Sequence, residues 1–281
     1  MNAAHIPANP TVAAAAPGAA GALPSWQRTP QGISLVRHAP PPRPILVHAE
    51  PEALTLDLAR TALVVIDMQN DFCHREGWFG AKGIDVSPMR APIPVLQDVL
   101  PAWRASGAPI VWVNWGIRPD LANLSPTIRF KGKRSAEDIG YGEPLPARDS
   151  RALVEGDWGA AVIDELPMDA GDLVVHKHRL SGFPDSELDS VLRQRGITTL
   201  VFAGINTDRC VFSTLQDAGF LGYDCLLLAD ACGTPSPEYV TRAIHFLVQQ
   251  LHGFVIGSTA LLPALAAAPA PAHPSFLKES A

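Results

Sequence analysis

The segment Val201-Phe-Ala-Gly-Ile-Asn-Thr-Asp-Arg-Cys210 decides how the rest of this chain is interpreted. It begins as an apolar strand ending near Ala203, turns at Gly204 and continues as a helix from about Arg209. Cys210 then lies in the first helical turn, where unsatisfied backbone N–H groups and the positive end of the helix dipole favour a thiolate. A cysteine in this position is a candidate nucleophile, and a small buried core residue is an equally weighted alternative.

Composition narrows the class of protein. The chain has 281 residues, of which 47% are hydrophobic, and a formal net charge of −6, which suits one sizeable α/β domain or two small ones. Mild acidity without a basic stripe argues against a nucleic-acid partner, and no apolar run is long enough to span a membrane. Four cysteines without a C-x-x-C pair are too few for a disulfide scaffold, so we expect a reducing, cytoplasmic setting.

Proline and alanine mark both ends of the chain. We expect residues 1–57 to form a Pro/Ala-rich arm, disordered over about the first 30 and extended along the domain thereafter. Residues 58–265 form the expected domain, and residues 266–281 a second Ala/Pro-rich tail. Neither end is expected to carry chemistry.

Buried strands alternate with helices through the domain. Continuous apolar runs predict strands at Thr61–Asp67, Pro109–Asn114, Asp172–Lys177, Thr198–Ala203, Tyr223–Ala229 and Gly253–Ile256. Helices are expected at Ser87–Ser106, Ser186–Arg195, Arg209–Phe220 and Ser236–Leu251. This alternation predicts right-handed βαβ units and a mainly parallel, doubly wound sheet with helices on both faces.

Three reactive side chains lie at the carboxyl ends of different predicted strands, where sheets of this kind bind ligands. There Lys177 would lower the pKa of the Cys210 thiol, and Asp67 would accept the thiol proton and pass it to a departing amine. The backbone N–H groups of Asn206 and Cys210 would bind the oxyanion. These parts together indicate acyl transfer from an amide to the thiol, followed by hydrolysis. Each residue also has a purely structural explanation when taken singly. Asp67 would be a strand-end turn residue, Lys177 part of a surface salt bridge and Cys210 a core residue.

The motifs Val64-Val-Ile-Asp67-Met-Gln-Asn-Asp-Phe72, the strand-end Lys177, and Gly204-Ile-Asn-Thr-Asp-Arg-Cys210-Val closely resemble the isochorismatase-like cysteine hydrolases. The resemblance covers about residues 55 to 265. It implies a six-stranded parallel sheet, a Cys/Asp/Lys triad and a non-proline cis peptide between Ile205 and Asn206. It also implies a homo-oligomer, a tetramer or a dimer.

Two further stretches indicate a small ureido or carbamoyl substrate. Residues 177–183 and 188–193 are similar to ureidoacrylate amidohydrolases, whereas residues 116–124 and 223–233 are more similar to biuret hydrolases. By the biuret-hydrolase pattern Gln250 is a substrate ligand, and an exposed helix glutamine is about as well supported. Other candidate substrate-binding residues are Arg118, Arg179 and Phe72. Residues 115 to about 158 form an unusually long loop, most of whose charged side chains are expected to be solvated.

Departures from related patterns exclude some chemistry. Nicotinamidases of this superfamily carry an Asp/His metal cluster after the second strand, where this chain has Asn114-Trp-Gly-Ile, so we expect no metal and no cofactor. His176 and His178 flank the lysine but face away from it, and packing roles are favoured over a metal pair. Enzymes that hydrolyse isochorismate lack the cysteine, so the presence of Cys210 argues against cleavage of a vinyl ether. The remaining alternatives are an amidase on a carbamoylsarcosine- or maleamate-type carboxamide, and a non-catalytic binding member of the fold.

Overall fold

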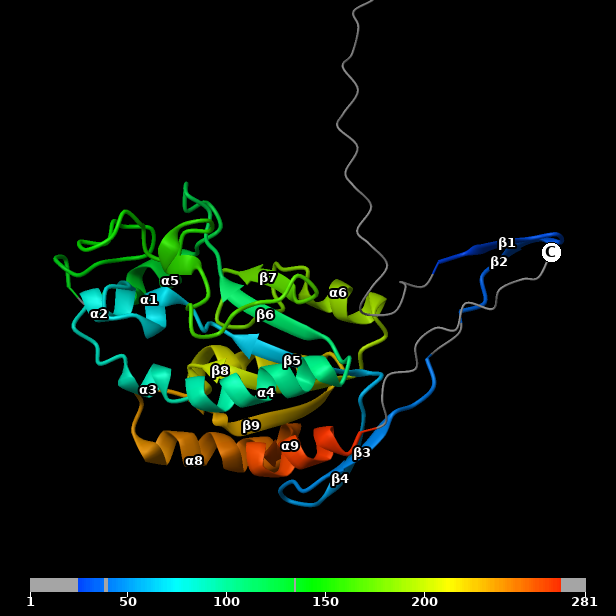
Figure 1. Ribbon diagram of the computed structural model, residues 1–281. Helices are drawn as coiled ribbons and strands as arrows, with labels where there is room; N and C mark the ends of the chain where they lie inside the picture. The colour runs from blue at the N-terminus through cyan, green and yellow to red at the C-terminus, as the bar shows by residue number, and fades with distance from the viewer. Residues whose placement is uncertain (1–24, 38–39, 134, 269–281) are drawn as a thin grey trace, which may run out of the picture.

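The fold is built on a single six-stranded sheet in which all neighbouring strands are parallel. The computed structural model describes residues 25–37, 40–133 and 135–268. In sheet order the strands are β10 (Gly253–Ile256), β9 (Asp224–Gly233), β8 (Thr199–Ile205), β5 (Thr61–Ile66), β6 (Ile110–Trp115) and β7 (Leu173–Lys177). The predicted α/β fold with a doubly wound parallel sheet is confirmed (Figure 1).

The first central strand, β5, shows why these apolar runs become sheet. All six of its residues are buried, and it pairs with β6 on one side and β8 on the other. Burying a single valine or leucine side chain stabilises the fold by roughly 1.5–3 kcal/mol, so such a strand is stable only at the centre of a sheet covered on both faces. The connection from β5 to β6 and the connection from β8 to β9 run in opposite directions across the sheet, so right-handed crossovers place α4 (Ile93–Ala105) and α7 (Phe212–Phe220) on opposite faces.

Several helices differ in detail from the sequence prediction. The helix expected over residues 87–106 is divided into α3 (Ser87–Arg90) and α4, because Pro92 has no N–H to donate to the preceding turn. Gly107 ends it as predicted, with φ of 74°. Two π-helical turns also occur, η2 (Thr207–Val211) before α7 and η3 (Val248–His252) after α8 (Glu238–Leu247).

The remaining helices are short and are not part of the six-stranded sheet. They are α1 (Asn70–Cys73), α2 (Trp78–Ala81), α5 (Pro126–Lys131), η1 (Trp158–Ala160), α6 (Leu188–Gln194) and α9 (Ser258–Ala266). Helix α9 follows the last strand and packs against α4 and β3 (Pro44–Val47). None of the helices in the described part of the chain combines the length and the apolar composition needed to cross a bilayer.

The N-terminal arm has two parts with different surroundings. Strands β3 and β4 (Leu54–Asp57) form a hairpin on the domain, secured by reciprocal backbone hydrogen bonds of 2.9 and 3.0 Å between Glu50 and Val255. Strands β1 (Gln27–Thr29) and β2 (Gly32–Ser34) form a second hairpin, which projects away from the body instead of lying along it (Figure 1). The disorder expected at the extreme N-terminus and the tail expected after residue 266 fall largely on residues 1–24 and 269–281, outside the described residues.

Candidate active site

The strand order places a topological switch point between β5 and β8, where successive connections leave in opposite directions. Asp67 directly follows β5, and its backbone takes the left-handed conformation with φ of 54°. Cys210 lies in η2, directly after β8. At this point Gly204 has φ of 107°, and a Cβ on it would lie 2.1 Å from the Ile66 carbonyl oxygen. Only glycine therefore lets β8 turn so close to the end of β5.

Lys177 reaches this point from two strands away. Its strand, β7, is separated from β5 by β6, so the two strands lie about 10 Å apart at the usual spacing of roughly 4.8 Å. The Lys177 Nζ lies 3.0 Å from the Asp67 Oδ2, and both side chains are essentially inaccessible to solvent. The Lys177 ammonium lies over the indole ring of Trp115, 4.2 Å from the ring centroid. A long, flexible cation at the end of β7 is thus paired with a carboxylate at the end of β5.

The backbone of Cys210 is tied through Thr214 to the loop that follows β7. The Thr214 hydroxyl donates to the Cys210 carbonyl at 2.6 Å and accepts from the Gly182 N–H at 3.0 Å. The Cys210 side chain is buried, and so is Asn206, which caps η2. The Ile205–Asn206 peptide is cis, as the family resemblance implied. The structure therefore brings together Asp67, Lys177, Cys210 and Asn206, all four of the residues predicted for the chemical step.

The protonation of the site differs from the prediction in one respect. Burial raises the pKa of Asp67, while Lys177 and a hydrogen bond with the Cys210 thiol oppose that rise. Burial and the nearby Asp67 raise the pKa of Cys210 to about 12, although Lys177 and a hydrogen bond from Trp115 lower it. The expected lowering of the Cys210 pKa is therefore wrong, because burial first and Asp67 second outweigh the effect of Lys177. Cys210 thus keeps its proton as a thiol beside the Asp67–Lys177 salt bridge.

The four tentative substrate-binding residues differ in exposure and partners. Arg118 is exposed and paired with Asp120, and Gln250 is exposed on η3. Arg179 lies nearer, since its carbonyl accepts from Lys177, but its guanidinium is engaged by Asp185 and the Asn123 carbonyl. Phe72 is buried against the rings of Trp78 and Phe79, with centroids 6.2 and 5.0 Å away.

Several residues that support the site were not singled out from the sequence. Gln69 accepts from the Trp115 N–H at 2.9 Å and donates to its carbonyl at 2.8 Å, which fixes the end of β6 to the end of β5. Asp71, whose pKa burial raises to about 6, accepts from the backbone N–H of Leu153 at 2.6 Å and so anchors the long loop. Both belong to the motif after β5, but nothing in the local sequence reveals partners that are 46 residues away for Gln69 and 82 residues away for Asp71.

The long loop also packs against Trp115, the residue beside Lys177. Tyr141 packs against the rings of Trp115 and Trp78, with centroids 5.4 and 4.9 Å away. The neighbouring backbone is fastened by the buried Lys82 ammonium, which donates to the Gly132 carbonyl at 2.7 Å and the Ile139 carbonyl at 3.1 Å. The charged side chains of the loop are mostly exposed, as expected, while its backbone is tied to the domain.

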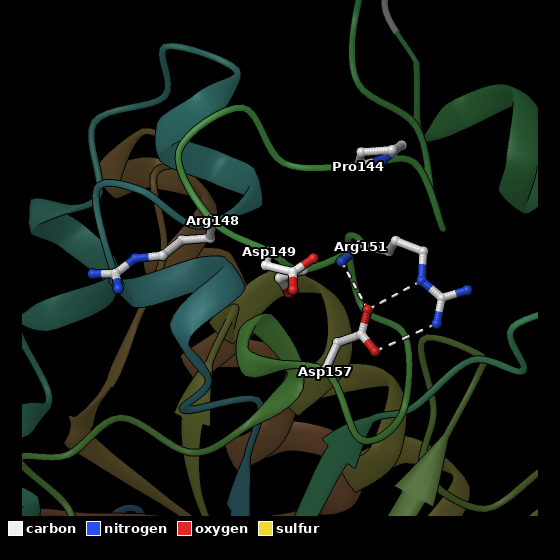
Figure 2. A pocket seen from close by; sticks show the side chains of 6 residues that line it. Pro144, Arg148, Asp149, Arg151 and Asp157 are labelled. Atoms are coloured by element: carbon white, nitrogen blue, oxygen red, sulfur yellow. Dashed lines mark hydrogen bonds and ion pairs between the residues drawn. The ribbon is translucent and has the colours of Figure 1, made fainter.

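A surface hollow on this loop lies among Pro144, Arg148, Asp149, Ser150, Arg151 and Asp157 (Figure 2). In it Arg151 is bound to Asp157, while Arg148 points away toward Glu76 and the ring of Trp158. The residues that line this hollow include no cysteine, lysine or histidine, and Asp67, Lys177 and Cys210 are not among them.

The two histidines beside Lys177 have acidic neighbours. His176 Nδ1 lies 3.1 Å from Glu155 Oε1, and His178 Nε2 lies 3.8 Å from Asp185 Oδ2. Nowhere in residues 25–37, 40–133 and 135–268 do three or more histidine, cysteine or acidic side chains gather in a way that could hold a metal ion.

Comparison with known proteins agrees with the geometry. Residues 61–260 match the model of the isochorismatase domain family. The chain belongs to this family. It is 36% identical over 234 residues to the ureidoacrylate amidohydrolase RutB of Stutzerimonas stutzeri (strain A1501), covering 80% of this chain and 91% of that protein.

Solved structures of the isochorismatase family share the fold. An N-carbamoylsarcosine amidase from Thermoplasma acidophilum is 30% identical with a TM-score of 0.54, covering 71% of this chain and 96% of that one. An isochorismatase family protein from Desulfovibrio vulgaris subsp. vulgaris str. Hildenborough is 28% identical with a TM-score of 0.60, covering 74% and 98%.

Proposed function

We propose that this protein is a cysteine-dependent amidohydrolase that cleaves a C–N amide bond of a small ureido or carbamoyl compound and releases ammonia. The protein is a hydrolase of carbon–nitrogen bonds other than peptide bonds, in keeping with the amidohydrolase and amidase names of its relatives. The observation that carries the cysteine mechanism is the buried set of Cys210, Asp67 and Lys177 at one switch point. A purely structural core cysteine has no need of a buried ion pair beside it.

The first half of the proposed reaction uses the proton that Cys210 holds at rest. Asp67 takes that proton as the sulfur attacks the substrate carbonyl, so a neutral acid and a thiolate replace a carboxylate and a thiol without changing the net charge. The Lys177 ammonium offsets the negative charge throughout. The backbone N–H groups of Asn206 and Cys210 are assigned to the carbonyl oxygen as it becomes an oxyanion.

The second half returns the enzyme to its starting state. Asp67 gives its proton to the departing amine, the C–N bond breaks, and a thioester to Cys210 remains. Water then attacks the thioester carbon while Asp67 again accepts a proton, and that proton returns to the sulfur as the C–S bond breaks. Every proton is carried by groups within the site.

The substrate is assigned to the ureidoacrylate or biuret type. Support comes from the relative named ureidoacrylate amidohydrolase, which the chain matches over 91% of that protein. The alternative is another small carboxamide of the carbamoylsarcosine or maleamate type, supported by the structural relative named N-carbamoylsarcosine amidase. Of the candidate substrate ligands, we favour Arg179, because its backbone already contacts Lys177.

The test is an ammonia-release screen over ureido acids, biuret and simple carboxamides, with Cys210→Ala and Cys210→Ser as the decisive variants. Both should lose at least about 1,000-fold in kcat while remaining folded. Cys225→Ser is the matched control, because Cys225 is equally buried but lies at the start of β9. Ammonia release that survives in Cys210→Ala would refute the nucleophile and leave the non-catalytic alternative to be considered.

We also propose that the chain forms a homo-oligomer, a tetramer or a dimer, in the cytoplasm. Tyr239 and Phe246 lie two turns apart on the same side of α8, with 66% and 60% of their surfaces exposed, which supports a subunit contact. All four cysteines are free thiols, which suits a reducing compartment. Light scattering on the purified protein measures the subunit number directly, and a monomer would contradict the proposal.

A further inference from the structure

The chain passes from β8 to Cys210 through a short turn, residues 206–210, which we call the nucleophile turn. Backbone pairing between β8 and β9 reaches only as far as Ile205 and Gly233, so this ladder ends one residue before Asn206. The pairing is also irregular just before this point, where β9 carries extra residues opposite β8. The sheet ladder therefore does not fix the position of the nucleophile turn, and other contacts have to do so.

Two hydroxyl groups from the segment after β9 bind the side chain of Asp208, in the middle of this turn. The Thr234 hydroxyl donates to Asp208 Oδ1 at 2.5 Å, and the Ser236 hydroxyl donates to Oδ2 at 2.8 Å. The Ser236 N–H in turn donates to the Thr234 hydroxyl at 3.3 Å, which orders the segment that supplies both donors. Each carboxylate oxygen of Asp208 thus accepts from a different residue beyond the end of β9.

The segment that binds Asp208 is itself fixed to the body of the domain. Gly233 ends β9 directly before Thr234, and a Cβ on it would lie 2.3 Å from the carbonyl oxygen of Pro88 in α3. Arg209 also lies beside the carboxylate, but its Nε is 3.9 Å from Oδ2, beyond hydrogen-bond distance. Only 13% of the Asp208 side chain is exposed, so its two hydroxyl bonds are largely shielded from competing water.

The two ends of the nucleophile turn carry the groups assigned to the reaction. Asn206 begins it, and the Asn206 carbonyl accepts from the N–H groups of Arg209 at 3.0 Å and Val211 at 3.2 Å. Cys210 ends it, directly before Val211. The backbone bonds hold the internal shape of the turn, whereas the bonds of Asp208 join it to the neighbouring strand. A displacement of the turn as a whole would therefore move the Asn206 N–H and the Cys210 sulfur together.

We propose that Asp208 is a positioning residue of this active site: it joins the nucleophile turn to the end of β9 and so keeps the N–H groups of Asn206 and Cys210 in place as the oxyanion forms. The inference rests on the proposed function, because it assumes that Cys210 attacks the substrate carbonyl. A displacement of about 1 Å in a catalytic group can cost about 100-fold in rate, and oxyanion donors act only at hydrogen-bond distance from the developing charge. Loss of the joint should therefore weaken catalysis more than substrate binding.

Asp208→Ala removes both acceptors and should lower kcat about 10- to 100-fold, with KM changed less than about three-fold. Asp208→Asn is the conservative variant, since its amide oxygen accepts from one hydroxyl and its amide N–H donates to the oxygen of the other. It should keep kcat within about three-fold of the parent protein. Removing the hydroxyls instead, with Thr234→Val and Ser236→Ala together, should lower kcat about as far as Asp208→Ala. Adding Asp208→Ala to that pair should lower kcat little further, because the same joint is already lost.

Asp230→Ala is the matched control. Its carboxylate also joins two elements, since it accepts from the Ser258 hydroxyl at 2.5 Å and the Ser258 N–H at 3.0 Å, but it ties β9 to the start of α9 and not to the nucleophile turn. This variant should unfold at a lower urea concentration while the folded protein keeps the parental kcat. Hydrogen exchange followed by mass spectrometry gives a second readout. The peptide covering residues 206–211 should exchange faster in Asp208→Ala and at the parental rate in Asp230→Ala.

Four results would overturn the inference. The first is a parental kcat in folded Asp208→Ala, and the second is a change confined to KM, which would make Asp208 a substrate contact. The third is an Asp208→Asn variant as slow as Asp208→Ala, because the charge and not the hydrogen bonds would then be needed. The fourth is an equal loss of kcat in Asp230→Ala, which would show a general loosening. Failure of the proposed function is seen separately, as ammonia release that persists in Cys210→Ala, whereas hydrogen exchange reports on the joint without any substrate.

Discussion

Replacing Lys177 with methionine tests the electrostatic logic of the site. Methionine fills much of the same volume but carries no charge, so the Asp67 carboxylate is left buried without its cation. Breaking a buried ion pair on one side typically costs about 3–5 kcal/mol. Asp67 can avoid part of this cost by remaining protonated in the folded protein, which makes the penalty depend on pH.

The size of the penalty follows from the pKa of the carboxyl group. Holding an acid protonated costs about 1.4 kcal/mol for each pH unit above its unfolded pKa, and that pKa is ordinarily 3.8 for aspartate. In Lys177→Met the cost of keeping Asp67 protonated is therefore at most about 4 kcal/mol at pH 7 and about 2 kcal/mol at pH 5. Since the pKa of Asp67 is already raised in the parent protein, we expect a net destabilisation of about 3 kcal/mol at pH 7.

The direction of the pH dependence follows from proton counting. Where the unfolded chain has released the Asp67 proton and the folded variant keeps it, stability falls as pH rises. In the parent protein Lys177 lowers the pKa of Asp67, so the fall in stability with rising pH ends at a lower pH than in the variant. The free-energy difference between the two proteins should therefore be smallest near pH 4 and grow toward pH 8.

Urea unfolding at pH 5, 6, 7 and 8 measures these differences, provided that the m-value stays constant. The control is Asp67→Asn combined with Lys177→Met, which removes both charges and should recover most of the lost stability while remaining inactive. A Lys177→Met penalty that is below about 1 kcal/mol at pH 8, or that does not change with pH, would refute the reasoning.

Four other outcomes are expected. Because the pKa of Cys210 is about 12, its alkylation in the resting enzyme should be slow at pH 7 and rise about ten-fold per pH unit; a plateau below pH 8 would contradict this. Gln69→Leu removes the side-chain partner of three backbone groups and should lower the free energy of unfolding in urea by about 2–4 kcal/mol. Unchanged stability would show that Gln69 does not hold the ends of β5 and β6 together. Gly204→Ala forces a Cβ to within 2.1 Å of a carbonyl oxygen and should cost at least about 3 kcal/mol, measured the same way against Gly171→Ala, where a Cβ meets no atom within 4 Å. Lys82→Met removes the cation that binds the Gly132 and Ile139 carbonyls, so limited proteolysis should cut near residues 132–139 sooner than in the parent protein.

The sequence by itself determined the fold and the three side chains proposed for the chemical step. Continuous apolar runs fix buried parallel strands, and the carboxyl ends of such strands meet at one edge, so Asp67, Lys177 and Cys210 were expected together before any distance was known. Local chemistry also predicted the stop at Gly107. Helix boundaries differ from the prediction by several residues, because Pro92 divides one helix and π-helical turns begin or end two others.

Only the tertiary structure decided the protonation of the site and the residues that surround it. A pKa depends on burial and on the distance between charges, so the helix N-terminus and Lys177 suggested a thiolate, whereas burial beside Asp67 keeps a thiol. Strand order put β6 between β5 and β7, and this alone made Trp115 the neighbour of Lys177. Spacing along the chain carries no signal for such a contact, because it arises from how the strands are ordered in the sheet.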